Sequence, residues 1–148
     1  SMGGWAMGIA AATMKDGYKS CIFASSSTGT YGCPDGTPTY PRNMGLIFSK
    51  YDEFSALMWL SPIPSNIVKS DKLKKVFNTQ EDVVVGKLYG SIEEGTARKL
   101  YQPSMIHPRV HFSTEAIGNA VEWFQMTLKG GKNLPPSDQT WYRKEIFT

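Results

Sequence analysis

The segment "KSCIFAS" (19–25) constrains the fold most, because it is a short apolar run that directly follows a segment with helical character. The preceding residues 4–15 are rich in Ala and Met and place Trp5, Ile9 and Ala12 on one helical face. A helix this apolar is not solvated on all sides, and we expect it to pack against a sheet. A helix that leads directly into a buried strand is typical of α/β proteins, so the sequence predicts an α/β fold.

Further segments extend this pattern. The Gly- and Pro-rich residues 26–42 predict a loop, and "MGLIFSK" (44–50) predicts a second buried strand. Residues 83–92 and 97–102 predict two strands of a hairpin, because Gly95 between them can adopt the positive φ that a turn requires.

Two later segments predict helices. Residues 65–78 are Lys-rich and predict a short helix with a solvated face. The clearest helix is "STEAIGNAVEWFQMTLKGG", which Ser113 can cap and the paired glycines at its end can stop. Its apolar residues recur at helical spacing and are expected to bury one face: Ile117, Val121, Phe124 and Leu128.

Composition excludes several classes of function. The 148 residues suit one core, and 16 basic against 13 acidic residues give a net charge of only +3, so we expect no nucleic-acid partner. With two cysteines and two histidines, a Cys/His zinc site is not expected. No stretch approaches the roughly 18–20 apolar residues of a membrane span.

A serine, an acidic residue and a histidine occur in this order along the chain, and together these three residue types can perform nucleophilic catalysis. A serine hydroxyl becomes a nucleophile when a histidine takes its proton, and that histidine needs a carboxylate to fix its tautomer. The chain supplies Ser1 before a helix, Asp52 after a predicted strand and a histidine after another. His107 is favoured as the base because it follows the strand end by five residues. His111, two residues before the helix cap, is the alternative.

Each of these residues also has a simpler interpretation. Ser1 and Met2 could be left from a cloning site ahead of the chain. Asp52 could cap the helix that begins after it, and the adjacent Glu53 is a weaker candidate for the acid.

At this point the sequence resembles the α/β-hydrolase family. "SMGG" is similar to the second half of a "GHSMGG" nucleophile elbow, and "LIFSKYDEF" is similar to the strand that precedes the acid. "HPRVHFSTEAIGNAVEWFQ" resembles the histidine loop and last helix. The resemblance implies that residues 1–134 are the C-terminal portion of an α/β-hydrolase domain, a partial fold whose N-terminal strands are missing. Residues 135–148 would begin a further helix or linker, as in similar bacterial proteins where such a segment leads into membrane helices.

The resemblance implies a serine hydrolase that cleaves an ester, thioester or amide of a small acyl substrate, without cofactor or metal. Ser1 would be the nucleophile, His107 (or His111) the base and Asp52 the acid. The backbone amide of Met2 would contribute to the oxyanion hole. The fragment alone is expected to be inactive and to pair with its missing N-terminal half or with a second copy. It would be membrane-associated only through sequence outside this stretch. The predicted hairpin between the acid and the histidine departs from the family's usual layout. The alternative to a hydrolase is a non-catalytic, hydrolase-like module for binding or oligomerisation.

Overall fold

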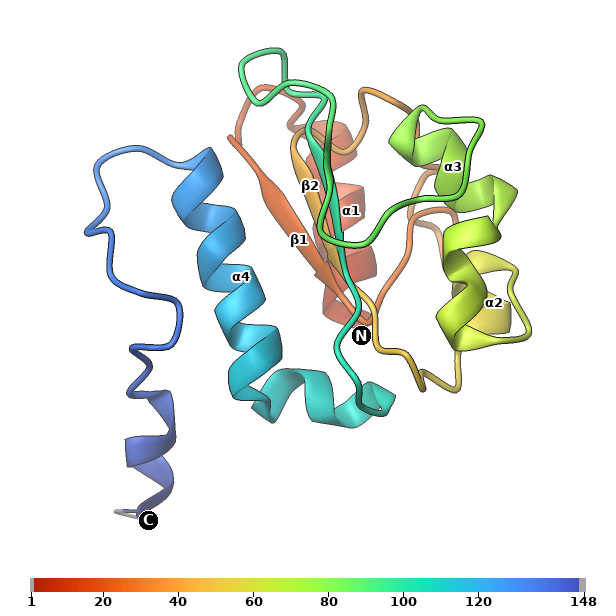
Figure 1. The fold of residues 1–148 in the computed structure, drawn as a ribbon. Helices are drawn as coiled ribbons and strands as arrows, with labels where there is room; N and C mark the ends of the chain where they lie inside the picture. Colours follow the sequence, from red (N-terminus) through yellow and green to blue (C-terminus); the bar gives the residue numbers. More distant parts are fainter. Residues whose placement is uncertain (1, 147–148) are drawn as a thin grey trace.

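The computed structural model describes residues 2–146, so Ser1 lies outside the described residues. A four-stranded sheet is covered by helices on its two faces (Figure 1). The strands are β1 (Cys21–Ala24), β2 (Met44–Ile47), β3 (Leu88–Tyr89) and β4 (Arg98–Tyr101). The α-helices are α1 (Met2–Thr13), α2 (Ser55–Trp59), α3 (Asp71–Phe77) and α4 (Thr114–Thr127). Three 3-10 helices complete the description: η1 (Pro64–Lys69), η2 (His107–Phe112) and η3 (Trp141–Ile146).

The sheet has the strand order β1-β2-β4-β3, in which the first three strands are parallel and β3 is antiparallel to β4. Leu46 of β2 is in register with Phe23 of β1 on one side and with Leu100 of β4 on the other. Parallel neighbours need crossover connections: residues 25–43, which contain no helix, connect β1 to β2, and the connection from β2 to β4 contains α2, η1 and α3. The fold class is α/β, as the sequence predicts. The carboxyl ends of the three parallel strands lie at one edge of the sheet, toward the bottom of Figure 1.

The larger core lies on one face of the sheet. Phe23, Leu46 and Phe48 pack there with Trp59 of α2 and with Leu73 of α3. All five side chains are fully buried. This face is also covered by α1.

Helix α1 packs on the sheet through small residues, together with Trp5 of the predicted face. Gly8 and Ala11 are buried, whereas Ile9 is exposed. A Cβ at Gly8 would lie 2.3 Å from the Cys33 sulfur, and one at Gly4 would lie 2.5 Å from the Ser26 Cβ. Of the predicted face, Trp5 does pack against the core, but Ile9 does not, because glycines bring this helix backbone close to the sheet and turn Ile9 to solvent.

Helix α4 covers the opposite face, also with a different side from the one predicted. Ser113 caps it by accepting from the Ala116 N–H, as expected. Trp123 is fully buried against Gly45 of β2, and its indole N–H donates to the Cys21 carbonyl at 3.0 Å.

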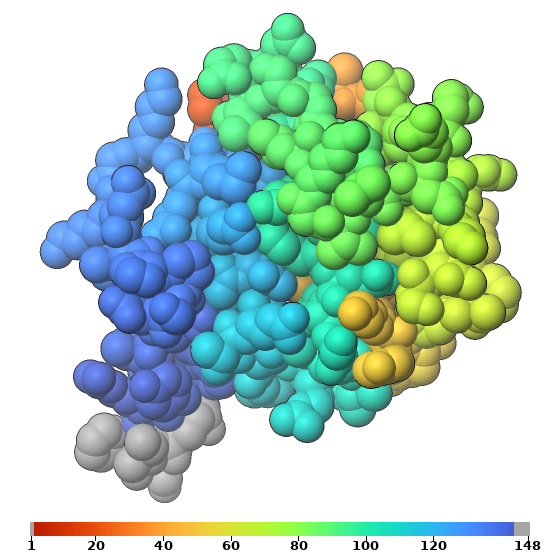
Figure 2. Space-filling view, in the orientation of Figure 1, coloured from red at the N-terminus to blue at the C-terminus, as the bar shows by residue number. Residues whose placement is uncertain are grey.

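The residues predicted to be buried on α4 instead border a hollow of about 600 Å³ between α4 and the chain that follows it (Figure 2): Ile117, Val121, Phe124 and Leu128. Phe124 and Leu128 are exposed. The room that Gly45 leaves for a tryptophan decides which side of the helix faces the sheet.

The remaining predicted elements are present in shorter form. The hairpin turns at Gly95 with φ +77°, as predicted, but its first strand is only Leu88–Tyr89 instead of residues 83–92. The helix predicted over 65–78 is divided into η1 and α3, because Ser70 between them is extended and donates its hydroxyl to the Trp59 carbonyl.

Candidate active site

The candidate site lies at the carboxyl edge of the sheet, where the backbone pairing of β2 and β4 continues past both strands. The N–H groups of Phe48, Lys50 and Tyr51 donate in turn to the carbonyls of Tyr101, Pro103 and Met105. Because these bonds extend the parallel register, the two loops after the strands run side by side. Figure 2 shows the gold segment after β2 at the surface beside the teal segment after β4.

Asp52 is held in the first of these loops by its own backbone and side chain. Its N–H donates to the Ser49 carbonyl, and its carbonyl accepts from the Ser55 N–H. The carboxylate oxygen Oδ1 accepts from the Phe54 N–H at 3.1 Å. Asp52 therefore does shape the entry into α2, as the simpler interpretation suggests, but this bond occupies only part of its carboxylate.

The same carboxylate contacts the imidazole of His107. The Nδ1 atom lies 2.9 Å from Asp52 Oδ2 and 3.0 Å from Oδ1. Asp52 is fully buried, while the His107 side chain retains 16% of its exposure. In the tautomer protonated at Nδ1, this N–H donates to the carboxylate and leaves Nε2 able to accept a proton. The arrangement can therefore orient and activate a general base.

Glu53 and Phe54 support the histidine in other ways. The Glu53 carboxylate accepts from the backbone N–H of His107 at 3.3 Å, and so it touches the main chain rather than the ring. The Phe54 ring meets the imidazole edge-on, with centroids 4.8 Å apart. Sequence reasoning considered Glu53 only as a rival acid and did not consider Phe54.

His111 lies in the same 3-10 helix η2 and is exposed. Partial burial of its imidazole lowers the pKa of His111. Within residues 2–146, no ion pair joins His111 to a carboxylate. The structure therefore brings Asp52 together with His107 and not with His111.

The N-terminal end of α1 reaches the same edge. Met2 is the first residue of α1, and Gly4 lies against Ser26, two residues after the end of β1 (Figure 1). The first amides of a helix lack intrahelical acceptors and favour negative charge. Met2 is thus placed at the head of α1, while the position of Ser1 relative to Asp52 and His107 is outside the described residues.

Buried hydroxyl groups also gather at this edge. Ser26 and Ser49 follow the neighbouring strands β1 and β2 and are fully buried. Their hydroxyl oxygens have no hydrogen-bond partner among the residues that the structure describes. Sequence reasoning treated the first of them only as part of a loop, although a serine run directly after a buried strand was visible.

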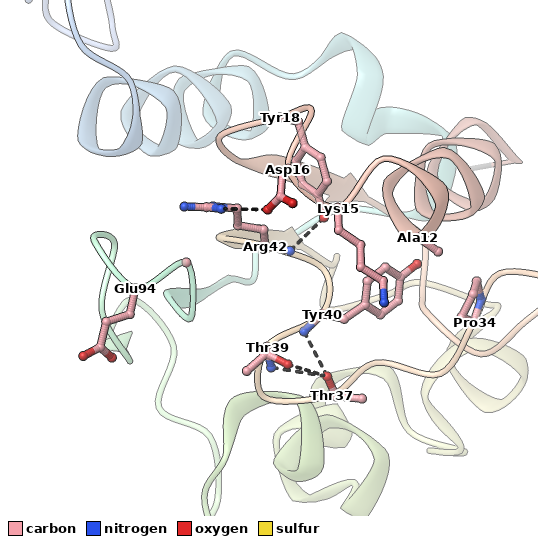
Figure 3. A pocket seen from close by; sticks show the side chains of 11 residues that line it. Ala12, Lys15, Asp16, Tyr18, Pro34, Thr37, Thr39, Tyr40, Arg42 and Glu94 are labelled. Atoms are coloured by element: carbon pink, nitrogen blue, oxygen red, sulfur yellow. Dashed lines mark hydrogen bonds and ion pairs between the residues drawn. The ribbon is translucent and has the colours of Figure 1, made fainter.

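Another cavity lies elsewhere, and no histidine is among the residues that line it. It has a volume of about 640 Å³ and lies around the end of α1, where Tyr18 and Tyr40 line it (Figure 3). The Tyr18 hydroxyl accepts from the Arg42 N–H, and the Tyr40 hydroxyl donates to the Gly8 carbonyl. Burial raises the pKa of both tyrosines. Both hydroxyls form hydrogen bonds with the backbone and so have a structural role. The cavity is not part of the candidate site.

Within residues 2–146, no three His, Cys, Asp or Glu side chains are grouped so that they could hold a metal ion. None of the described helices is long and apolar enough to cross a membrane.

No family model matches the chain, and no curated protein or solved structure is detectably similar to it.

Proposed function

We propose that the protein is a serine hydrolase that cleaves an ester, thioester or amide through an acyl-serine intermediate. The observation that carries the proposal is the contact of both Asp52 carboxylate oxygens with His107 Nδ1. A fully buried carboxylate that holds an accessible imidazole is the arrangement by which hydrolases prepare a general base.

In the proposed reaction, His107 Nε2 takes the proton from the Ser1 hydroxyl as its oxygen attacks the substrate carbonyl. Asp52 stabilises the imidazolium that forms. The amide of Met2, at the head of α1, donates to the oxyanion of the tetrahedral intermediate. His107 then gives the proton to the leaving group. A water molecule, activated by the same imidazole, hydrolyses the acyl-serine and regenerates the hydroxyl.

The finer fold assignment, a partial α/β-hydrolase fold, is part of the proposal. In its support, Asp52 follows β2, His107 follows the adjacent parallel strand β4, and the amphipathic α4 comes next. Among the described residues, β1 pairs only with β2, so its other edge is open to a further strand. Such a strand, from preceding sequence or from a second copy, would bury an edge that parallel sheets do not usually expose.

A fluorophosphonate probe tests the proposal on the protein that carries this chain with its full natural sequence. The expected result is one adduct on the serine numbered 1, located by peptide mass spectrometry and absent after heat denaturation. A folded protein that forms no adduct would refute the hydrolase and favour the non-catalytic binding or oligomerisation module.

A further inference from the structure

An exposed apolar row begins beside the candidate base, at the N-cap of α2, and continues to the residue before η1. Its members recur every three residues and are all large and apolar: Phe54, Leu57, Leu60 and Ile63. They are 43%, 44%, 71% and 52% exposed, whereas Met58 and Trp59 between them are buried. α2 thus buries one side in the core and, with its caps, presents Phe54, Leu57 and Leu60 to solvent, while Ile63 follows in the extended residue before η1.

The row is joined to the candidate site by direct contact. Phe54, its first member, packs edge-on against the His107 ring. Phe54 and Leu57 are three residues apart at the start of α2, a spacing that makes side chains neighbours on a helix. A substrate group that extends past the His107 ring on this side therefore meets apolar side chains.

The backbone conformation of Leu60 indicates that the row has a function. It is the C-cap of α2 in the left-handed conformation, with φ 55° and ψ 33°. Glycine or asparagine is preferred in this conformation, and a branched apolar residue there is strained. A leucine that is both strained and largely exposed adds nothing to the core, and such strain clusters at functional sites.

The charged residues near the row indicate that the group it would bind is uncharged. No charged residue occurs between Glu53 and Lys69 in the chain, and the Lys72 ammonium that reaches α2 donates to the Met58 carbonyl at 2.7 Å. The carboxylates of Asp52 and Glu53 both lie against His107 and disfavour a second negative charge nearby. By contrast, the hollow beside the histidine loop, about 620 Å³, is lined by Arg109 and Glu115 as well as by apolar residues.

We infer that the row binds the uncharged hydrocarbon chain of the acyl group, so that the enzyme prefers medium-chain acyl substrates over acetyl ones. The inference rests on the proposed hydrolase function and adds the substrate class. An alkyl chain of about eight carbons can lie along several of these side chains, and each methylene removed from water favours binding.

The test compares p-nitrophenyl octanoate with p-nitrophenyl acetate, below micellar concentrations, on the full natural protein and on Leu60→Gly. Glycine relieves the strain at φ 55°, so the variant is expected to keep or raise its melting temperature. We expect kcat/KM for octanoate to exceed that for acetate by about 10-fold or more, and Leu60→Gly to reduce this ratio by about 3- to 10-fold. Leu134→Ser, which changes an exposed leucine on the segment after α4, is the matched control and should leave the ratio unchanged.

The outcomes separate the inference from its premise. Hydrolysis with equal kcat/KM for both esters, or an unchanged ratio in Leu60→Gly, overturns the acyl-chain inference and leaves the hydrolase intact. Failure of both esters together with failure of fluorophosphonate labelling overturns the hydrolase itself, and the inference with it.

Discussion

Asp52 and His107, 55 positions apart in the chain, meet through a carboxylate that contacts Nδ1 with both oxygens, at 2.9 and 3.0 Å. The carboxylate is fully buried and also accepts from the Phe54 N–H, which fixes its orientation before the histidine binds it. A buried carboxylate against Nδ1 favours the tautomer of His107 that is protonated at this atom. This relationship is the basis of the first two predictions.

Asp52→Asn should reduce kcat by about 10³- to 10⁴-fold without unfolding the protein, because an amide no longer selects the Nδ1-protonated tautomer. Turnover of p-nitrophenyl esters and the circular dichroism spectrum measure the two effects. Glu53→Gln is the matched control: its amide oxygen can still accept from the His107 backbone, so a loss of about 5-fold at most is expected. An equal loss in both variants would contradict the assigned roles.

His107→Ala should abolish labelling by a fluorophosphonate probe, whereas His111→Ala should retain it. Among the residues that the structure describes, His107 and not His111 forms an ion pair with a carboxylate, and His111 is exposed near the end of η2. In-gel fluorescence after a timed reaction gives the labelling rates, and thermal melts report folding. Retained labelling in His107→Ala would transfer the role of base to His111.

The strands could be predicted from local sequence, and the packing of helices on them could not. Short apolar runs bounded by turn residues locate β1 and β2 well. Val84 and Val85 have the same apolar character but are exposed, so the predicted first strand of the hairpin was too long. The buried side of α4 depends on Gly45, 78 positions before Trp123, and helical periodicity contains no information about that pairing.

The candidate site was predictable as an order of residues but not as a set of contacts. The succession of strand, acid, strand and histidine was sufficient to choose Asp52 and to favour His107. The contact of Glu53 with the His107 backbone depends on how far the pairing of β2 and β4 extends into the loops. That extension is a property of the parallel register, which no local pattern specifies.

Cys21 should be unreactive toward thiol reagents in the folded protein. Burial raises its pKa to about 12, so at pH 8 almost no thiolate forms. Burial also raises the pKa of Cys33. With a dithionitrobenzoate reagent we expect both thiols to react at least ~100-fold more slowly than in 6 M guanidinium chloride. Rapid reaction of either thiol in the folded protein would show that the core around β1 opens easily.

Because the pKa of Cys21 is raised, the stability of the folded protein changes with pH in the alkaline range. The folded-state pKa of Cys21 lies above its unfolded value, so the folded state binds more protons once the unfolded thiol ionises near pH 9. The stabilising contribution is complete below that pH and is lost as the pH rises toward 12. Urea midpoints at pH 7.5 and 10 should therefore differ less in Cys21→Ala than in the natural protein.

Gly45→Ala should destabilise the protein by about 1–3 kcal/mol, because its Cβ would lie 2.8 Å from the Trp123 indole. The indole cannot move away cheaply, since its N–H donates to the Cys21 carbonyl and the side chain is fully buried. Urea denaturation followed by circular dichroism measures the change. Gly131→Ala, where no atom lies within 4 Å of the added methyl group, is the control and should shift the midpoint little. If the two variants unfold at the same urea concentration, α4 does not pack on the sheet through Trp123.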